Sequence, residues 1–396
     1  MLDRSSARDE VVRLTRDLVR IRSINPPGDE LPAAELLAQR LKGFGFETEV
    51  VEVAKNRANV VAVLRGRGDG PALMFNGHLD VVPPGDLSTW SRDPFAGDVA
   101  DGKIYGRGSS DMKGGVASMS VAGGLLAASG EKMKGDLIIT AVSGEESDSI
   151  GTRHYVERNT LDGIGGIVIP ESTSLELVIA EKGTIWLEVN TYGKTAHSTQ
   201  LEIGINAIEH MVATLHEIKS KWESIGYAKD PYLSPPTINI ATIVGGVKTN
   251  SIPDRCTATI DLRPVPSQEH PKIIRAMQEA VDGMKGKLKG FRGEIKVINE
   301  RLPFATDPSS DFVKMAQALG PSTLGLPLDP PFGVNFFTDA AIFATKRSIP
   351  TIILGPGEYD LRRNIYLGHQ PNEYVKIENL EKATRFYYEL SRSFLK

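Results

Sequence analysis

The order in which helical and strand patterns follow one another constrains the fold of this chain more than any other feature. In the first 180 residues, helical patterns at 11–21, 33–41 and 114–128 are interspersed with short apolar runs at 60–64, 72–75, 137–142 and 164–169. Apolar runs bounded by Gly or Asp are typical of buried strands. Helices between such strands predict an α/β layer with a mixed, largely parallel sheet.

Between residues 183 and 297 the order of the patterns changes. Strand and helix patterns follow one another there as β-α-β-β-α-β, at 185–189, 205–218, 238–244, 256–262, 273–284 and 295–298. This order is that of the ferredoxin-like split unit, which is self-contained. We therefore expect 183–297 to be a second domain inserted into the first, which comprises 1–182 and 298–396.

The charge balance and the single cysteine exclude several classes of protein. Lys and Arg number 46 and Asp and Glu 50, which leaves a net charge of −4 without long runs of one sign. We therefore expect no nucleic-acid partner and no membrane-surface patch.

Because the N-terminus lacks an apolar signal segment and no apolar run is long enough to span a membrane, we expect a soluble, cytoplasmic protein. Cys256 cannot form an intrachain disulfide, and its strand pattern favours a buried structural thiol over a nucleophile.

A group of His, Asp and Glu residues stands at the ends of expected strands or in the adjoining loops. Its members are His78, Asp80, Asp111, Glu145, Glu146, Glu171 and His369. In an open α/β sheet, ligands bind at the carboxyl ends of the strands. Two imidazoles and several carboxylates that converge there could hold two divalent ions, since zinc takes such ligands and keeps one position open for water.

Each of these residues also has a purely structural interpretation. A single Asp or Glu in a loop is usually a solvated charge, and a histidine after a strand is usually hydrogen-bonded rather than bound to metal. The spacing of the residues alone leaves both interpretations open. The structural interpretation is preferred for the histidines in or beside helical patterns, which are His154, His210, His216 and His270.

Short motifs surround the candidate residues in a characteristic order. They are Asn76-Gly-His-Leu-Asp80, Trp90 with Asp93-Pro-Phe95, Asp101-Gly-Lys-Ile-Tyr-Gly-Arg-Gly108, Asp111-Met-Lys-Gly-Gly115, Gly144-Glu-Glu146, Thr191-Tyr-Gly-Lys-Thr-Ala-His-Ser198, Asn250-Ser-Ile-Pro253, Asp261-Leu-Arg263 and Thr338-Asp-Ala340. Together they closely resemble the co-catalytic zinc amidohydrolase family of acetylornithine deacetylase, succinyl-diaminopimelate desuccinylase, aminoacylase and glutamate carboxypeptidase. The resemblance covers nearly the whole chain. It implies that 183–297 is a lid and dimerisation domain and that the chain forms a homodimer.

The resemblance also implies a set of metal ligands. His78 and Glu171 would bind one ion, Glu146 and His369 a second, and Asp111 would bridge the two. The ions would be zinc, with cobalt or manganese as alternatives. At the position of Glu171 the family usually has an acidic residue followed by Pro-Thr, whereas here the proline comes before the carboxylate.

Catalytic roles follow from the same resemblance. Asp80 would accept the second ring N–H of His78 and so fix its tautomer, and Glu145 would be the general base. His197 would reach the neighbouring active site of the dimer and stabilise the oxyanion of the tetrahedral intermediate. The structural alternative for His197 is a histidine that caps or packs the following helix.

This combination of residues predicts hydrolysis of an amide bond in a small N-acyl amino acid or a dipeptide. Two divalent ions ~3.5–4 Å apart can hold a bridging hydroxide and polarise a carbonyl oxygen, and a carboxylate can pass the proton to the leaving amine. Hydrolysis of another C–N bond, in a small aromatic amide or amine, is a rival within the enzymes. An inactive metal-binding homologue is a further rival, against which the retained Glu145 argues. A two-metal phosphatase is disfavoured because the ligand motifs carry no cluster of Arg or Lys.

Residues of the inserted domain are candidates for holding the substrate. Arg263 and Asn250 would bind the substrate carboxylate, Arg263 through its bidentate guanidinium. The alternative for Arg263 is an exposed cation on a strand. Lys182 could also line the site, but we expect a solvated lysine there.

Overall fold

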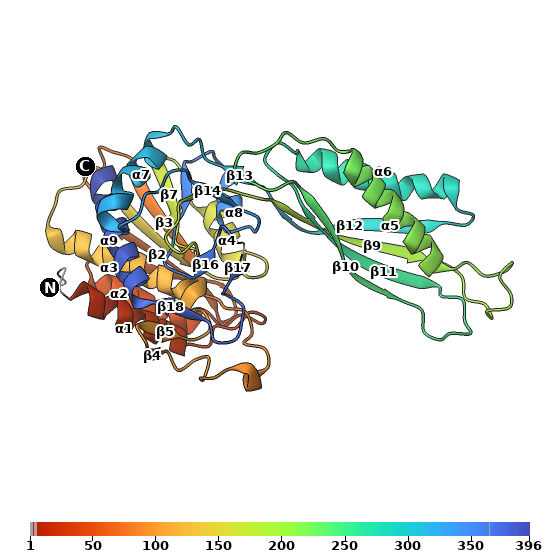
Figure 1. Ribbon diagram of the computed structural model, residues 1–396, viewed down its shortest axis with the longest axis horizontal. Coiled ribbons are helices and arrows are strands. Elements are labelled where there is room, and N and C mark those ends of the chain that lie inside the picture. Colours follow the sequence, from red (N-terminus) through yellow and green to blue (C-terminus); the bar gives the residue numbers. More distant parts are fainter. Residues whose placement is uncertain (1–2, 4–5, 364) are drawn as a thin grey trace. The chain divides into compact units, whose positions relative to one another are not determined.

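The computed structural model describes residues 3, 6–363 and 365–396, and these form two compact units (Figure 1). Unit 1 comprises Met1–Ala180, Ala305–Val334 and Thr338–Lys396. Unit 2 comprises Glu181–Phe304 together with Asn335–Phe337. Each unit has its own sheet, and unit 2 is inserted within the sequence of unit 1.

The sheet of unit 1 is mixed and has a parallel centre. Its strands are β1 (Glu47–Ala54), β2 (Arg57–Leu64), β3 (Ala72–His78), β6 (Leu137–Val142), β7 (Ile164–Ile169), β8 (Val178–Glu181), β13 (Phe304–Ala305), β14 (Phe332–Val334) and β15 (Thr351–Ile353). Their order in the sheet is β1-β2-β6-β3-β7-β15-β8-β13, and β14 pairs with β8. The pairs β6-β3, β3-β7 and β7-β15 are parallel, whereas β1-β2, β2-β6 and β15-β8 are antiparallel. The mixed, largely parallel sheet expected from the sequence is therefore confirmed.

Helices and short strands complete unit 1. The helices are α1 (Ala7–Arg20), α2 (Leu31–Gly43), α3 (Gly114–Ser129), α4 (Ile150–Arg158), α7 (Asp311–Thr323), α8 (Ala340–Ala344) and α9 (Ile377–Phe394). The short strands β4 (Asp98–Ala100), β5 (Lys103–Tyr105) and β18 (Tyr374–Lys376) form one small sheet, and β16 (Tyr359–Asp360) pairs with β17 (Ile365–Tyr366).

Helix α3 consists largely of Gly, Ala and Ser, and this composition lets its backbone approach its neighbours closely. Every residue of α3 from Gly114 to Leu126 is buried. A Cβ atom added at Gly115 would lie 2.1 Å from the carbonyl oxygen of Pro170, and one at Gly123 would lie 2.7 Å from the ring of Phe46. The helix therefore sits against the segment that follows β7, which carries one of the candidate ligands.

Unit 2 is a four-stranded antiparallel sheet with two helices. Its elements are β9 (Thr184–Tyr192), α5 (Ala207–Ser224), β10 (Thr237–Gly245), β11 (Arg255–Arg263), α6 (His270–Lys287) and β12 (Arg292–Arg301), and its strand order is β10-β11-β9-β12. Helices α5 and α6 cover one face of this sheet (Figure 1). Met211 and Met277 pack in one cluster with the strand residues Val189 and Ile260, and the thiol of Cys256 is buried in the same core. Residue 297, the expected end of the inserted domain, lies inside β12.

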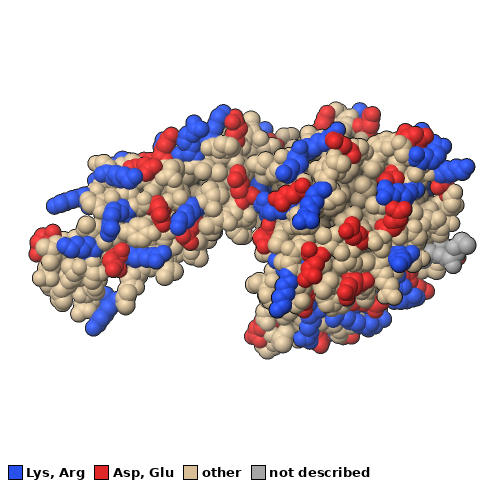
Figure 2. All heavy atoms as spheres, turned by 180° about the vertical axis from the view of Figure 1, so that it is seen from behind, with Lys and Arg blue, Asp and Glu red and all other residues tan. Residues whose placement is uncertain are grey.

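The mixed charges on the surface are consistent with the small net charge of the chain. Figure 2 shows Lys and Arg side chains interspersed with Asp and Glu over the visible face. In the described part of the chain, no helix combines the length and the apolar character needed to cross a membrane.

Candidate metal centre

The candidate ligands of unit 1 come from three neighbouring parallel strands and two loops. His78 is the last residue of β3, the turn with Glu145 and Glu146 follows β6, and Glu171 follows β7. Because β6, β3 and β7 are parallel neighbours, their carboxyl ends meet at one edge of the sheet. Asp111 precedes α3, and His369 follows β17.

Asp111 lies between the two histidines and offers one carboxylate oxygen to each. Its Oδ1 is 3.1 Å from Nε2 of His78, and its Oδ2 is 3.0 Å from Nε2 of His369. Nε2 of His78 is also 3.3 Å from Oε1 of Glu171. Nε2 of His369 is 3.0 Å from Oε1 of Glu146. The residues thus form two His–carboxylate groups that share a single carboxylate.

The donor atoms lie close enough together to hold metal ions. The ligand atoms of His78, Glu145 and Glu171 lie within 4.8 Å of one another, and so do those of His78, Asp111 and Glu146. Imidazole nitrogens and carboxylate oxygens are ligands that zinc and other first-row divalent ions accept. The chemistry of the donors therefore fits a pair of divalent cations.

Burial and crowded negative charge shift the pKa values of these groups. Burial, followed by the charge of Asp111, raises the pKa of Glu171 to about 8 and the pKa of Glu146 to about 7. Burial lowers the pKa of His369, but hydrogen bonds with Asp111 and Glu146 outweigh it and raise that pKa to about 11. Burial would raise the pKa of Asp111, but hydrogen bonds from His369 and His78 hold it well below its usual range. Divalent cations can replace the protons that otherwise compensate such a cluster.

The carboxylate of Asp80 mainly binds the turn after β6, and the imidazole of His78 lies further from it. Its Oδ1 accepts hydrogen bonds from the backbone N–H groups of Gly144 (3.0 Å) and Glu145 (3.2 Å), and its Oδ2 accepts one from that of Glu146 (3.2 Å). Nδ1 of His78 lies 3.0 Å from the carbonyl oxygen of Asp80 but 3.5 Å from its Oδ1. The expected contact between this carboxylate and the ring is therefore the longer one, because the amides of the turn point at the carboxylate.

The structure adds Tyr366 to the residues around Asp111. The hydroxyl group of Tyr366 donates a hydrogen bond to Oδ2 of Asp111, and its ring packs edge-on against that of His369 with centroids 5.5 Å apart. None of the sequence motifs marks this residue. Its position three residues before His369 was the one available signal.

The candidates in unit 2 have well-defined local contacts. Nε of Arg263 lies 3.0 Å from a carboxylate oxygen of Asp261, and its guanidinium lies 5.1 Å from the ring centre of Phe337. His197 is exposed, and its Nδ1 lies 2.9 Å from Oγ1 of Thr199. Asn250 is also exposed. Their roles toward a substrate stay predictions.

Lys182 is not the solvated lysine that the sequence predicted. It is 1% exposed, and its Nζ donates hydrogen bonds to Oγ of Ser234 (2.9 Å) and to the carbonyl oxygen of Pro235 (2.6 Å). Burial and the nearby charge of Arg263 lower the pKa of Lys182 to about 8. The prediction was wrong because the segment that covers the lysine lies more than fifty residues further along the chain.

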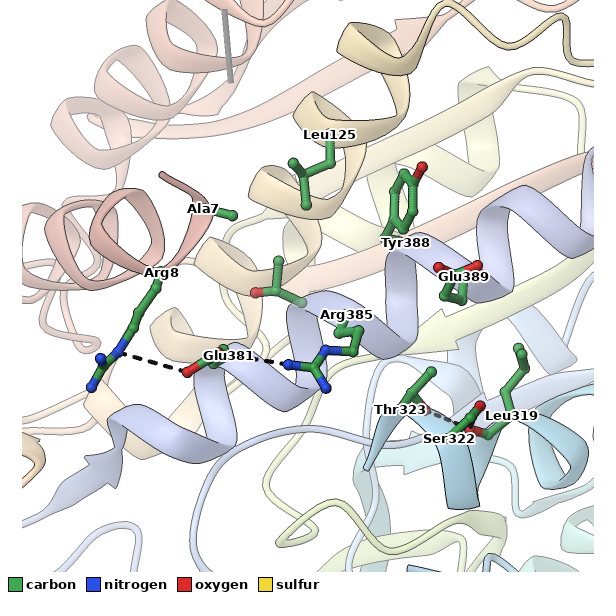
Figure 3. Close-up of a pocket in the computed structure, with 11 residues that line it drawn as sticks. Ala7, Arg8, Leu125, Leu319, Ser322, Thr323, Glu381, Arg385, Tyr388 and Glu389 are labelled. Carbon is green, nitrogen blue, oxygen red and sulfur yellow. Dashed lines mark hydrogen bonds and ion pairs between the residues drawn. The ribbon is translucent and has the colours of Figure 1, made fainter. Parts of the chain in front are cut away.

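A separate cavity of about 430 Å³ lies among α1, α3, α7 and α9 (Figure 3). Arg8 and Arg385 both point toward Glu381 there, each 3.6 Å from a carboxylate oxygen. Leu125, which also lines the cavity, is eleven residues along α3 from Gly114, roughly 16 Å by helical rise. None of the candidate metal ligands is among the residues that line this cavity.

Solved structures of similar fold cover almost the whole chain. An M20 family metallo-carboxypeptidase from Sulfolobus solfataricus matches with a TM-score of 0.80 at 21% identity, over 98% of this chain and 99% of the other. A dinuclear metal-binding peptidase of the M20 family from Bacillus subtilis matches with a TM-score of 0.73 at 18% identity, over 99% of both chains.

Comparison of sequences identifies the family. An acetylornithine deacetylase from Shigella sonnei is 33% identical over 356 residues, which cover 88% of this chain and 87% of the relative. A probable succinyl-diaminopimelate desuccinylase from Staphylococcus epidermidis is 26% identical over 415 residues and covers 97% of both chains. The model of peptidase family M20/M25/M40 matches residues 74–393. The chain therefore belongs to peptidase family M20/M25/M40 and is a metal-dependent hydrolase.

Proposed function

We propose that the chain uses two divalent metal ions, with zinc as the expected metal, to hydrolyse the amide bond of a small N-acyl amino acid or a dipeptide-like substrate. The observation that carries this proposal is the position of Asp111, whose two oxygens face His78 and His369 separately. A carboxylate in this position can bridge two cations. His78 and Glu171 would hold one ion, and Glu146 and His369 the other.

The pair of ions would supply an activated water molecule and polarise the carbonyl group of the substrate. Glu145 is the general base, which takes a proton from the water and returns it to the leaving amine. Its carboxylate lies beside the ligand atoms of His78 and Glu171, within 4.8 Å. Asp80 positions Glu145 by binding the backbone N–H of that residue.

The names of two relatives support the substrate class. One is a deacetylase and the other a probable desuccinylase, and both names describe removal of an acyl group from an amino acid. We propose that Arg263 and Asn250 bind the carboxylate of the substrate. Since Nε of Arg263 is engaged by Asp261, the terminal nitrogens of the guanidinium are the donors for this contact.

We also propose that unit 2 is a ferredoxin-like lid through which two copies of the chain pair. Strand β10 is an edge of its sheet, and in the described chain only β11 pairs with it. Its side chains Ile240, Ile243 and Val244 are 42%, 51% and 72% exposed. An exposed edge with apolar side chains is a template for pairing with another strand, and a second copy would cover it. His197 would then act in the active site of the partner copy, as a donor to the oxyanion.

The test of the proposed function combines metal analysis with a substrate panel. Protein purified without chelator should contain two divalent ions per chain, and it should release amine from one or more N-acetyl, N-succinyl or N-formyl amino acids or dipeptides. Chelation should abolish turnover, and addition of zinc should restore it. Asp111→Asn should lose both ions, whereas Asp307→Asn, at an exposed aspartate far along the sequence, should lose neither. Full turnover in metal-free protein would refute the proposal, and turnover of aromatic amides alone would favour the rival C–N hydrolysis.

A further inference from the structure

We infer that Glu373, together with Arg107, is a positioning residue that holds Asp111 in place between the two ligand groups. The inference rests on the proposed metal centre. Glu373 belongs to none of the ligand groups described above, and it is 1% exposed.

The carboxylate of Glu373 binds the backbone of the loop that carries Asp111. Its Oε1 accepts hydrogen bonds from the N–H groups of Ser110 (2.9 Å) and Asp111 (3.0 Å), and its Oε2 accepts one from Nη1 of Arg107. The backbone carbonyl of Glu373 also accepts a hydrogen bond from the N–H of Gly106 (2.9 Å). The single residue Glu373 therefore binds the loop at residues 106, 107, 110 and 111.

The same contacts join the two segments that carry Asp111 and His369. Glu373 lies four residues after His369, and β18 begins at the next residue. Strand β18 pairs with β5, so that Tyr374 lies opposite Tyr105, just before the loop of Asp111. The segments 103–111 and 369–376 are therefore fixed to each other, and Glu373 sets the distance between the bridging carboxylate and the histidine of the second ion.

The energetics of the ion pair favour positioning over simple stabilisation. Arg107 is 1% exposed, so both charges have been removed from water. Among the described residues, Nε of Arg107 has no hydrogen-bond partner, although its guanidinium carbon lies 5.3 Å from the ring centre of Trp90. Burying two charges with one donor unsatisfied contributes little or no net stability. Outer residues that orient metal ligands commonly contribute 10–100-fold to metal affinity, and Glu373 is placed to do so.

The decisive variant is Glu373→Gln, which keeps the shape of the side chain and removes its charge. Glu358→Gln is the matched control, because Glu358 is also buried, at 5% exposure, and its carboxylate binds Nζ of Lys376 and Nδ2 of Asn379. Both variants lose a buried carboxylate, but Glu373→Gln also leaves the buried Arg107 without its counter-charge, so its melting temperature should fall further than that of Glu358→Gln, whose partner Lys376 is half exposed. We expect the Kd for zinc, measured by competition with a chromophoric chelator, to rise ~10–100-fold in Glu373→Gln and to change less than about twofold in Glu358→Gln.

A second variant keeps the test valid if Glu373→Gln does not fold. Glu373→Asp retains the charge beside Arg107 but is shorter by one methylene, so it withdraws from the two N–H groups and should also weaken zinc binding. Zinc affinity at the wild-type level in a folded Glu373 variant, or an equal loss in Glu358→Gln, would overturn the inference. If the wild-type chain itself bound no divalent ions, the proposed function would fail instead, so the two failures are distinguishable.

Discussion

Glu145 and Glu146 are adjacent in the sequence, yet the turn after β6 sends their carboxylates to different partners. Oε1 of Glu146 lies 3.0 Å from Nε2 of His369, whereas a carboxylate oxygen of Glu145 lies within 4.8 Å of ligand atoms of His78 and Glu171. Neighbouring residues can divide base and ligand in this way because the amides of both are held by Asp80. At the scale of single residues, the assignment of the two roles is therefore open to a direct test.

Glu145→Ala should lower kcat by ~10²–10⁴, the usual contribution of a general base, while both metal ions remain bound. Glu146→Ala should instead lower the metal content, because it removes the carboxylate proposed to bind one ion together with His369. Metal analysis of the two purified variants beside steady-state kinetics checks the prediction. Loss of metal from Glu145→Ala with retention in Glu146→Ala would show that base and ligand are interchanged.

Lys182→Met should remove part of the pH dependence of stability at alkaline pH. The pKa of Lys182 is about 8 in the folded chain, against about 10.4 for an unfolded lysine. Between these two values the unfolded chain binds more protons, so the free energy of unfolding rises with pH there. Below the folded pKa both states are protonated, and the folded state carries the full cost of the buried ammonium group.

Urea unfolding at about pH 7.5 and about pH 9.5 measures this rise. It should be smaller in Lys182→Met than in the wild-type chain. Lys229→Met, at an exposed lysine of unit 2, is the control and should show the wild-type rise. An unchanged rise in Lys182→Met would mean that this lysine does not titrate in the interval.

At the scale of elements, the close approach of α3 to the end of β7 links packing to the metal centre. Gly115→Ala would place a Cβ 2.1 Å from the carbonyl oxygen of Pro170, the residue before Glu171. Because the obstacle is backbone, helix and strand must separate, which costs about 1–3 kcal/mol and displaces Glu171 from His78. We expect a lower melting temperature and weaker zinc binding.

Gly283→Ala in α6 is the matched control for Gly115→Ala. Nothing lies within 4 Å of the added Cβ at Gly283, so alanine should stabilise the helix by about 0.5–1 kcal/mol. Zinc affinity should not change in this variant. Wild-type zinc binding in Gly115→Ala would show that the packing of α3 does not determine the position of Glu171.

At the scale of the whole molecule, the proposed pairing of two copies predicts complementation. His197→Ala and Glu145→Ala should each be inactive, but in a mixed dimer one site loses both residues and the other keeps both. Activity should therefore partly return when subunits exchange, as measured by turnover after mixing. Heterodimers that form without recovery would exclude a shared site.

The interface itself is tested by a charge on the edge of the sheet. Ile243→Lys places a charge among the exposed apolar residues of β10 and should give monomers by analytical ultracentrifugation. Val212→Lys, at a residue 58% exposed on α5, is the control and should remain a dimer. Dimers of unchanged stability in Ile243→Lys would place the interface elsewhere.

Elements whose hydrophobic patterns are local could be predicted from the amino-acid sequence. The apolar runs at 137–142 and 164–169 coincide with β6 and β7, because a buried strand needs apolar residues along its whole length. Strand β1 was missed, since none of its residues is buried and no apolar face marks it. The motifs also marked His78, Asp111, Glu146, Glu171 and His369, which the fold brings together.

The partners that these residues contact depend on how the chain folds in three dimensions. Glu373 binds the backbone of Asp111 across 262 positions of sequence, and the hydroxyl of Tyr366 reaches the same residue across 255. Lys182 is buried by a segment 52 residues away. Periodicity reports which face of an element is apolar, but the burial of a charge depends on the side chains that the topology places around it. For that reason the motifs marked the candidate ligands and Asp80, whereas the contacts of Glu373 and Tyr366 with Asp111 could not be predicted from them.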